Sequence, residues 1–406
     1  MSAAVVTTFL RARRGSFVAI LFAFFTLALL ASCGGGGSGD APAPAANAPL
    51  AGNVVAVTVD RGPDGAAINS PFVSVTVCAP GTAECQTVDH VLVDTGSFGL
   101  RLVASAMSPA ISLPVVSSPA GLPVAECSHF VTGFVWGSVR RADVKLADHV
   151  AANLPVQVVS DPASLYANVP VSCSNTGANF GGDLGVNGIL GVGSFNQDCP
   201  ACALSTAPAV YFGCAATGCT ETVLPLSAQV ANPVPAFAAD NNGVALVLPE
   251  VPQGGATTLS GSLIFGIGTQ SNNQLGTETV YVTDSRGDFT TTYKDVVYPS
   301  SFLDSGSNGI FFRDASIPQC SGFYCPPAPL SLTAVNTSAT GVSGTVNFTI
   351  ESIQSISRSM AAAHVGGDIG LTRSFDWGLP FFYGRTVFIA ISGASTPKGN
   401  GPYWAY

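Results

Sequence analysis

Charged side chains are scarce in this 406-residue chain, where they occupy 10% of positions, and basic residues are the rarer kind, with 15 Lys and Arg against 24 Asp and Glu. The formal net charge is −9, so the chain has no excess of cations to neutralise phosphates, and we expect no nucleic-acid partner. Hydrophobic residues make up 47% of the chain. That proportion excludes an intrinsically disordered protein, and the shortage of Glu, Lys and Arg excludes a coiled coil.

The sequence also lacks the motifs of several enzyme classes. It contains no His-Glu-x-x-His zinc motif, no Gly-x-Ser-x-Gly nucleophile motif and no phosphate loop ending in Gly-Lys-[Ser/Thr]. The four histidines show no metal-ligand spacing; they are His90, His129, His149 and His364. We therefore expect no cofactor and no metal. The segment Asp240-Asn241-Asn242-Gly243 has oxygen atoms that suit calcium, but a turn before a strand at 244–248 already explains it.

Long apolar runs are missing after the first 32 residues. The run from Phe17 to Leu30 follows Arg11, Arg13 and Arg14. It is shorter than the ~20 residues needed to cross a bilayer. A basic start, a short apolar run and small residues at its end are typical of a secretory signal, so residues 1–32 are predicted to direct export.

A cysteine follows this leader, in Leu30-Ala31-Ser32-Cys33. The segment resembles the lipobox of bacterial lipoproteins, which implies that Cys33 carries a lipid that anchors the chain to a membrane. An ordinary cleaved leader is the alternative. Gly34 after the cysteine implies the outer membrane, on its periplasmic or surface side, by the same resemblance. Residues 33–52 are rich in Gly, then Pro and Ala, and are predicted to be a flexible tether.

Ten cysteines remain after Cys33, and an even number in an exported protein favours disulfides. Short separations predict bonds between Cys78 and Cys85 and between Cys320 and Cys325, with a longer bond from Cys127 to Cys173. The other four residues leave alternatives open, because they could form disulfides, a four-thiolate zinc site or a redox pair at the first two positions. They are Cys199, Cys202, Cys214 and Cys219.

The remaining chain has the pattern of an all-β protein. Short runs rich in Val, Ile, Thr and Phe are interrupted by Gly, Pro, Asn or Asp. A hairpin is predicted from strands at 72–77 and 87–93, with a turn at 79–81, and it ends at Asp94. Strands at 280–282, 289–293 and 296–303 end in the same way at Asp304. The sequence therefore brings an aspartate to the end of an apolar strand twice.

The two strand ends share a motif. The two segments are Asp94-Thr95-Gly96-Ser97 and Asp304-Ser305-Gly306-Ser307. Each directly follows a pair of apolar residues. Each is followed by one variable residue, then Gly, then Leu or Ile. Two carboxyl groups held face to face cannot both ionise, so one acts as a base toward water while the other acts as an acid toward a carbonyl. The glycines permit a tight turn, and the hydroxyl residues supply donors that orient the carboxylates.

These paired motifs resemble the active-site loops of pepsin-like aspartic peptidases. Three further segments resemble other parts of that family and occur in the same order along the chain: 187–193, 261–268 and 375–382. The resemblance implies an all-β, bilobal double β-barrel with an active-site cleft between the lobes. The resemblance is confined to separate short segments between roughly residues 70 and 391. The whole chain also resembles a family of bacterial lipoproteins of unknown function.

The same resemblance implies a flap, a hairpin that closes over substrate, in the segment 130–137. Phe130, Gly133, Trp136 and Gly137 would form it. Phe130 stands where the family usually has Tyr, and Phe cannot donate a hydrogen bond. An ordinary buried hairpin is the alternative interpretation of this segment.

We expect an N-terminal lobe over 53–235 and a C-terminal lobe over 236–406, divided at Asn232-Pro233-Val234-Pro235 because proline disfavours strand pairing. The predicted function is an aspartic endopeptidase, a monomer whose substrate is a peptide or protein. Asp94 and Asp304 would be catalytic, and six neighbours would orient them: Thr95, Gly96, Ser97, Ser305, Gly306 and Ser307. One alternative is a pepsin-like lipoprotein that binds a peptide, glycan or envelope protein without cleaving it. Another is a structural envelope protein, in which the two carboxylates would not face each other.

Overall fold

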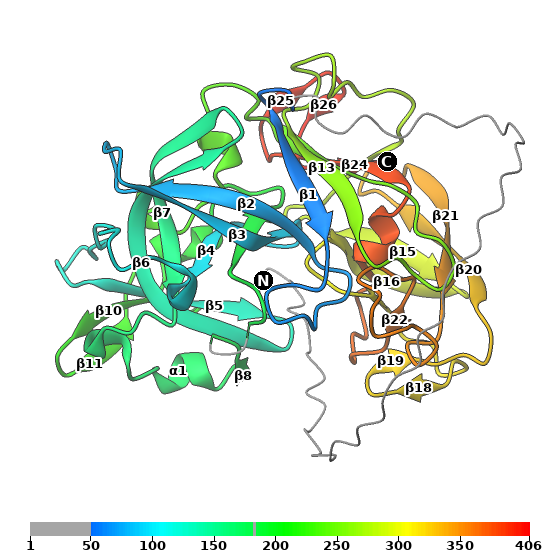
Figure 1. Ribbon diagram of the computed structural model, residues 1–406, viewed down its shortest axis with the longest axis horizontal. Coiled ribbons are helices and arrows are strands. Elements are labelled where there is room, and N and C mark those ends of the chain that lie inside the picture. The colour runs from blue at the N-terminus through cyan, green and yellow to red at the C-terminus, as the bar shows by residue number, and fades with distance from the viewer. Residues whose placement is uncertain (1–49, 182–183) are drawn as a thin grey trace, which may run out of the picture.

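The computed structural model describes residues 50–181 and 184–406, which Figure 1 colours from blue to red along the chain. The predicted signal, Cys33 and most of the tether lie outside the described residues. The regular secondary structure of the described chain is almost wholly β-strand, which confirms the all-β fold class. No helix within these two ranges is long and apolar enough to cross a membrane.

Strands β2 (Pro71–Cys78) and β3 (Cys85–Asp94) form the predicted first hairpin. In β2, Val73, Val75 and Val77 are buried, and Ser74 between them is exposed. This alternation is what a strand with one face on a core requires. The turn between the strands is possible because Gly81 has a φ of 70°, a conformation that glycine adopts without strain.

The left half of Figure 1 is a β-barrel. Six strands pair with their neighbours in the order β6, β7, β4, β9, β3 and β2. Because β2 also pairs with β6, the sheet closes on itself. Closure removes the unpaired edges of a sheet. Val75, Val91, Leu100, Val156 and Leu190 belong to one buried cluster that joins these strands. The barrel strands not yet given are β4 (Phe98–Val103), β6 (Gly133–Leu146), β7 (His149–Val159) and β9 (Gly188–Val192).

Smaller elements extend this barrel. β5 (Val124–Phe130) pairs with β6 as a hairpin, and β10 (Tyr211–Ala215) and β11 (Gly218–Glu221) continue the sheet from β5. β8 (Ala178–Asn179) pairs in parallel with β6. Within the described residues, helical structure is limited to α1 (Val171–Ser174) and short 3₁₀ turns at Ala104–Ala106, Ser164–Tyr166, Pro200–Ala203, Leu226–Ala228, Val234–Ala236 and Leu379–Phe382.

A shared sheet joins the two halves of the molecule. β1 (Val54–Val59) pairs along its whole length with β13 (Leu259–Phe265), and the two lie side by side between the halves in Figure 1. The sheet continues through β12 (Gly243–Leu248), β24 (Arg385–Ala390), β27 (Tyr403–Ala405) and β14 (Val280–Val282). A strand from the first lobe therefore pairs across the expected division at 235, and the exact lobe boundary stays a prediction.

The second half holds another mixed sheet. Its central strands are β16 (Val296–Asp304), β23 (Asp376–Gly378) and β17 (Ile310–Phe311). Beyond them lie β15 (Phe289–Tyr293), β20 (Leu330–Thr337) and β21 (Ser343–Ile350) on one side, and β22 (Gly366–Gly367), β19 (Phe323–Tyr324) and β18 (Gln319–Cys320) on the other. A separate ribbon pairs β25 (Ser395–Thr396) with β26 (Gly399–Asn400).

Aromatic side chains fill the core of this half. Phe312 and Phe375 stack with ring centroids 4.8 Å apart, and Trp377 meets Phe375 at 4.4 Å. Trp377, Phe381, Phe382 and Tyr383 are all buried. The aromatic run near residue 380 therefore packs the core of the second half.

All ten cysteines within the described residues are paired. The three predicted disulfides, Cys78–Cys85, Cys127–Cys173 and Cys320–Cys325, are confirmed. The four cysteines that left alternatives open form Cys199–Cys202 and Cys214–Cys219. Zinc binds cysteine as a free thiolate, and these four sulfurs are bonded to each other instead.

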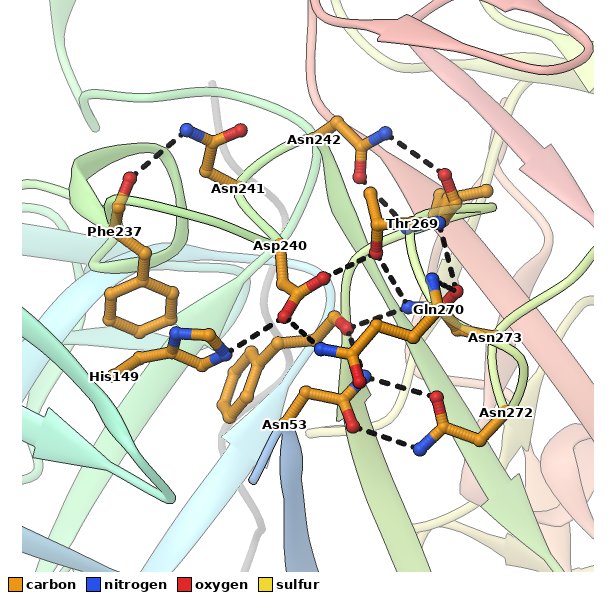
Figure 2. Close-up of polar contacts among 12 residues, drawn as sticks. Asn53, His149, Phe237, Asp240, Asn241, Asn242, Thr269, Gln270, Asn272 and Asn273 are labelled. Carbon is orange, nitrogen blue, oxygen red and sulfur yellow. Dashed lines mark hydrogen bonds and ion pairs between the residues drawn. The ribbon is translucent and has the colours of Figure 1, made fainter. Parts of the chain in front are cut away.

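The segment that suited calcium is a hydrogen-bonded turn, drawn in Figure 2. The Asp240 carboxylate accepts hydrogen bonds from the Thr269 hydroxyl and the Gln270 amide, and His149 from β7 lies 3.3 Å away. Asn242 donates instead to Ile267 O at 3.0 Å, on the side away from Asp240. Donors therefore occupy the Asp240 oxygen atoms, and the segment links the barrel to the shared sheet.

Candidate active site

Asp94 and Asp304 occupy matching places in the two halves. Asp94 is the last residue of β3, which runs parallel to β9 and pairs Asp94 with Gly191. Asp304 is the last residue of β16, which runs parallel to β23 and pairs Asp304 with Gly378. The chain thus builds the same strand arrangement twice, with an aspartate at the same point of each.

The residues after the aspartates bind each other across the two halves. The Thr95 hydroxyl accepts a hydrogen bond from the Ser305 N–H at 2.9 Å and donates to Leu303 O at 3.2 Å. The Ser305 hydroxyl accepts from the Thr95 N–H at 3.1 Å and donates to Val93 O at 2.7 Å. This reciprocal pairing satisfies buried backbone groups and holds the two loops in a fixed relation.

Each carboxylate receives two donors from its own loop. Asp94 accepts from the Gly96 N–H at 2.9 Å and from the Ser97 hydroxyl at 2.5 Å. Asp304 accepts from the Gly306 N–H at 2.8 Å and from the Ser307 hydroxyl at 2.9 Å. Hydrogen bonds to a charged acceptor are stronger than neutral ones, so these four donors orient both carboxyl groups.

The two carboxyl groups face each other, and each lies against the loop glycine of the other half. They are buried, with exposed fractions of 1% for Asp94 and 0% for Asp304. The loop glycines leave the space between them. A Cβ on Gly96 would lie 2.6 Å from Asp304 Cγ, and one on Gly306 would lie 2.8 Å from Asp94 Cγ. Each glycine therefore packs against the opposite carboxyl, and neither position has room for a side chain.

Burial raises the pKa of Asp94 above its usual value, and the donors Ser97, Asp304 and Gly96, with the charge of Arg101, offset part of that rise. Two carboxyl groups held this close disfavour a second negative charge, so pairs of this kind share one proton over a range of pH. Such a pair has one group able to accept a proton and another able to donate one.

A buried ion network lies beside Asp94 and was not expected from the sequence. Arg101 donates to Glu126 at 2.6 Å, to Asp198 at 3.0 Å and to the backbone oxygen of Phe98 at 2.8 Å. Burial raises the pKa of Glu126, which the Arg101 charge opposes. An arginine inside the apolar segment 98–103 was the available signal, because a buried cation requires acidic partners.

Residues 49–406 match the family described as "Protein of unknown function (DUF3443)". The chain belongs to this family. A search of curated proteins finds no match. Among solved structures, the fold of this DUF3443 member is similar to the crystal structure of an aspartic proteinase from Irpex lacteus, at 15% sequence identity and a TM-score of 0.48. The similarity covers 87% of this chain and 96% of that chain.

The segment that resembles a flap is a hairpin of β5 and β6, with Phe130 paired to Gly133. Phe130 is buried in a first-half cluster that includes Val135 and Ile189. Val131, at the tip, packs against a second-half cluster that includes Phe311. The hairpin tip therefore contacts both halves of the DUF3443 protein, and its opening over a substrate stays a prediction.

The other residues expected in the flap lie within the sheet. Trp136 points into a separate cluster and donates its indole N–H to Tyr166 O at 2.8 Å. A Cβ on Gly133 would lie 2.1 Å from Ala178 O, and a Cβ on Gly137 would lie 1.9 Å from Val158 O. Both glycines thus allow close strand packing, and Trp136 is a core residue on the far side from Phe130.

A cavity lies beside the two aspartate loops. Phe98 and Phe195 meet edge to face in its wall, with ring centroids 5.3 Å apart. Thr95 and Gly96 of the first loop also line it, as do Leu303 and Asp288. Burial and the nearby Asp284 raise the pKa of Asp288, which Arg286 opposes. The cavity thus offers an aromatic surface and an acid next to the loop that carries Asp94.

No group of three or more potential metal ligands occurs among the described residues. His90 lies on β3, before Asp94 in the chain. Its Nε2 lies 3.2 Å from the Asp60 Oδ2, and its ring packs edge to face against Phe72. Its side chain is 29% exposed. His90 is therefore a partly exposed residue that pairs with Asp60.

One more carboxyl lies against the second aspartate loop. Asp376 of β23 is fully buried, and its Oδ2 lies 2.7 Å from the Ser307 hydroxyl. Its role was not predicted from the sequence, although an acid inside the apolar segment 375–382 was a visible signal.

Proposed function

We propose that this DUF3443 protein is an aspartic endopeptidase. The observation that carries the proposal is the buried pair of Asp94 and Asp304, which face each other and each have their own N–H and hydroxyl donors. A pair of this kind supplies a base and an acid at one point without a metal or a covalent intermediate.

The chemistry that this pair would perform is hydrolysis of a peptide bond. A water molecule held between the carboxyl groups attacks the carbonyl carbon while the ionised aspartate takes its proton. The protonated aspartate donates its hydrogen to the carbonyl oxygen, giving a tetrahedral diol. The C–N bond then breaks as the aspartate that took the water proton gives it to the leaving nitrogen. The other aspartate takes a proton from one diol hydroxyl as the carbonyl re-forms, so the pair again holds one proton.

Substrate binding would use the surfaces next to the pair. An extended peptide pairs readily with an exposed strand or hairpin edge, and the hairpin of β5 and β6 would supply that edge. The cavity beside Gly96 has an aromatic wall at Phe98 and Phe195, which suits an apolar side chain of a peptide. We expect a peptide or protein substrate for this reason.

A second candidate function is binding of a peptide, glycan or envelope protein without cleavage. The observation that favours it is the burial of both carboxyl groups, at 1% and 0% exposure. A substrate carbonyl reaches such a pair only if the elements over it move, and Phe130 lacks the hydroxyl that would tune the hairpin.

The test is hydrolysis of a diverse peptide library by the full-length protein in detergent, from pH 3 to 7. Asp94→Asn and Asp304→Asn are each expected to abolish cleavage, because an amide cannot replace the shared proton. Asp64→Asn is the matched control, since Asp64 is exposed in a turn. Cleavage that survives in either dyad variant would overturn the mechanism, and a folded wild type with no cleavage at any pH would favour the binding function.

We also propose that the protein is an exported lipoprotein anchored through Cys33, in the outer membrane. The support is the leader sequence and its Leu30-Ala31-Ser32-Cys33 ending. Cells that express the protein would be labelled with a radioactive fatty acid and fractionated. We expect label in the wild type and none in Cys33→Ser, and an unlabelled wild type would contradict the anchor.

A further inference from the structure

Asp376 lies on the strand that supports Asp304. β23 runs parallel to β16, with Asp376 opposite Phe302 and Gly378 opposite Asp304. The Asp376 side chain is 0% exposed. Its Oδ2 lies 2.7 Å from the Ser307 hydroxyl, and its Oδ1 has no hydrogen-bond partner. Ser307 therefore stands between two carboxyl groups, because the same hydroxyl lies 2.9 Å from Asp304.

Among the described residues of the first half, the matching position holds no such third acid. β9 runs parallel to β3 with Gly191 opposite Asp94 and Ile189 opposite Leu92. Ile189 thus occupies the place that Asp376 occupies in the second half, and it is buried in an apolar cluster. Ser97, the counterpart of Ser307, is bound to Asp94 alone among the carboxyl groups. The extra carboxyl is therefore a chemical difference between two otherwise matching loops.

The surroundings of Asp376 favour its neutral form. Burial raises the pKa of Asp376 well above its usual value, Ser307 opposes the rise, and the charge of Asp94 adds to it. The titratable groups that face it are Asp94 from β3 and, through Ser307, Asp304 from β16. Its other neighbour, β17, brings Ile310 and Phe311. No basic residue of the described chain contributes to this shift.

A neutral Asp376 determines where the Ser307 hydrogen points. With the proton on Oδ2, Asp376 donates to the Ser307 oxygen, and the single hydroxyl hydrogen of Ser307 is left to donate to Asp304. An ionised Asp376 would accept that hydrogen instead. Asp304 would then lose a hydrogen-bond donor and gain a neighbouring negative charge. Both changes destabilise the ionised form of Asp304, so Asp304 binds a proton more tightly.

We propose that Asp376 is a positioning residue of the aspartate pair, a neutral acid that directs the Ser307 hydroxyl toward Asp304 and withdraws that hydroxyl when it ionises. The site therefore has three carboxyl groups, and the third governs the geometry of the pair without touching the substrate. The pH–activity part of this inference rests on the proposed function, whereas the protonation of Asp376 is measurable in the absence of any activity.

The first test reads the protonation directly. Full-length protein in detergent, labelled with 13C at the aspartate side-chain carboxyl, would be titrated from pH 4 to 7 by NMR. The resonance absent from Asp376→Asn is expected at the position of a protonated acid throughout. Asp314, identified in the same way with Asp314→Asn, is the internal reference for an ionised aspartate, since its pKa lies at about 2. An Asp376 resonance at the carboxylate position at pH 6 would overturn the inference.

A second variant provides the same measurement if Asp376→Asn does not fold. In the double variant Asp94→Asn and Asp304→Asn, both replacements are isosteric and neutral. A protonated aspartate carbon at pH 6 is still expected, and it must belong to a carboxyl other than the pair. Loss of every protonated aspartate signal in this variant would overturn the inference.

The pH–activity profile then tests the effect on the pair. Asp376→Asn stays neutral and donates through its amide at every pH. We expect its profile to match the wild type up to about pH 7, where Asp376 of the wild type is protonated. Above that pH we expect the alkaline limb to move upward by about half a pH unit or more, because the Ser307 hydroxyl is no longer withdrawn from Asp304. Superimposable limbs, or an equal loss of rate at every pH, would mean a purely structural role. If the wild type cleaves nothing, the proposed function fails, and the NMR result still decides the state of Asp376.

Discussion

At the scale of single residues, the glycines between the two carboxyl groups give a direct test of their facing arrangement. A Cβ on Gly96 would lie 2.6 Å from Asp304 Cγ, too close for any real contact. We expect Gly96→Ala to push the pair apart and to lower peptide hydrolysis by about 100-fold, the order expected for an ångström-scale misplacement of reacting groups. Gly276→Ala, in an exposed loop with its nearest neighbour 3.4 Å away, is the control. Equal rates for Gly96→Ala and the wild type would contradict the arrangement.

Asp314 allows a prediction about stability and pH. Burial alone would raise its pKa, but donors from Lys294, Ser316 and Tyr293 outweigh burial and lower it to about 2 from 3.8. A lowered pKa in the folded state contributes stability above pH 3.8, and that contribution is lost as the pH falls toward 2. We expect Asp314→Asn to reduce the free energy of unfolding by about 2 kcal/mol at pH 7. Urea unfolding at pH 7 and pH 2.5 should show the difference from wild type shrinking at the lower pH, and a constant difference would refute the assignment.

At the scale of elements, the disulfides differ in the length of chain that they close. Cys127–Cys173 spans 46 residues and joins β5 to α1, whereas Cys214–Cys219 spans 5 residues between β10 and β11. Loop-closure entropy predicts a loss of about 4 kcal/mol for the long bond and about 2 kcal/mol for the short one when both cysteines become serine. Thermal unfolding of the two double variants would compare them. A larger loss for the short bond would show that native-state strain, not chain entropy, sets the effect.

At the scale of the whole molecule, Asn69 joins the two halves. Its amide donates to Asn308 O at 2.8 Å and to Ala363 O at 2.9 Å, and its carbonyl accepts from the Ala363 N–H and the Tyr383 hydroxyl. Asn69 has a φ of 53°, which glycine also adopts, so Asn69→Gly removes these bonds without backbone strain. We expect a loss of about 2–4 kcal/mol in stability, because buried partners are left unpaired.

The same substitution should loosen the second aspartate loop, since Asn308 directly follows Ser307. Hydrogen exchange of the segment 305–309 is expected to speed up in Asn69→Gly. Ser160→Gly, at an exposed position with a φ of 56°, is the matched control. Unchanged exchange in the loop would mean that Asn69 stabilises the molecule without supporting the site.

Local patterns were enough to predict the strands that lead into both aspartate loops, and the loops themselves. The hairpin that ends at Asp94 followed from alternation in 72–77 and from the turn at Gly81, because side-chain period and turn chemistry act between neighbouring residues. The three short-range and medium-range disulfides followed from spacing and an even count. The buried ion network of Arg101 was not predicted, because its partners, Glu126 and Asp198, are distant in the chain.

The sequence by itself determined that the chain is all-β and that two Asp-[Thr/Ser]-Gly-Ser loops end apolar strands, since these properties depend on residues close together in the chain. Only the tertiary structure decided that Ser307 lies between Asp304 and Asp376, that β1 pairs with β13 across the two halves, and that Cys199 bonds to Cys202. The reason is physical: such contacts depend on how packed sheets bring remote segments together, and no local pattern encodes which buried acid meets which hydroxyl.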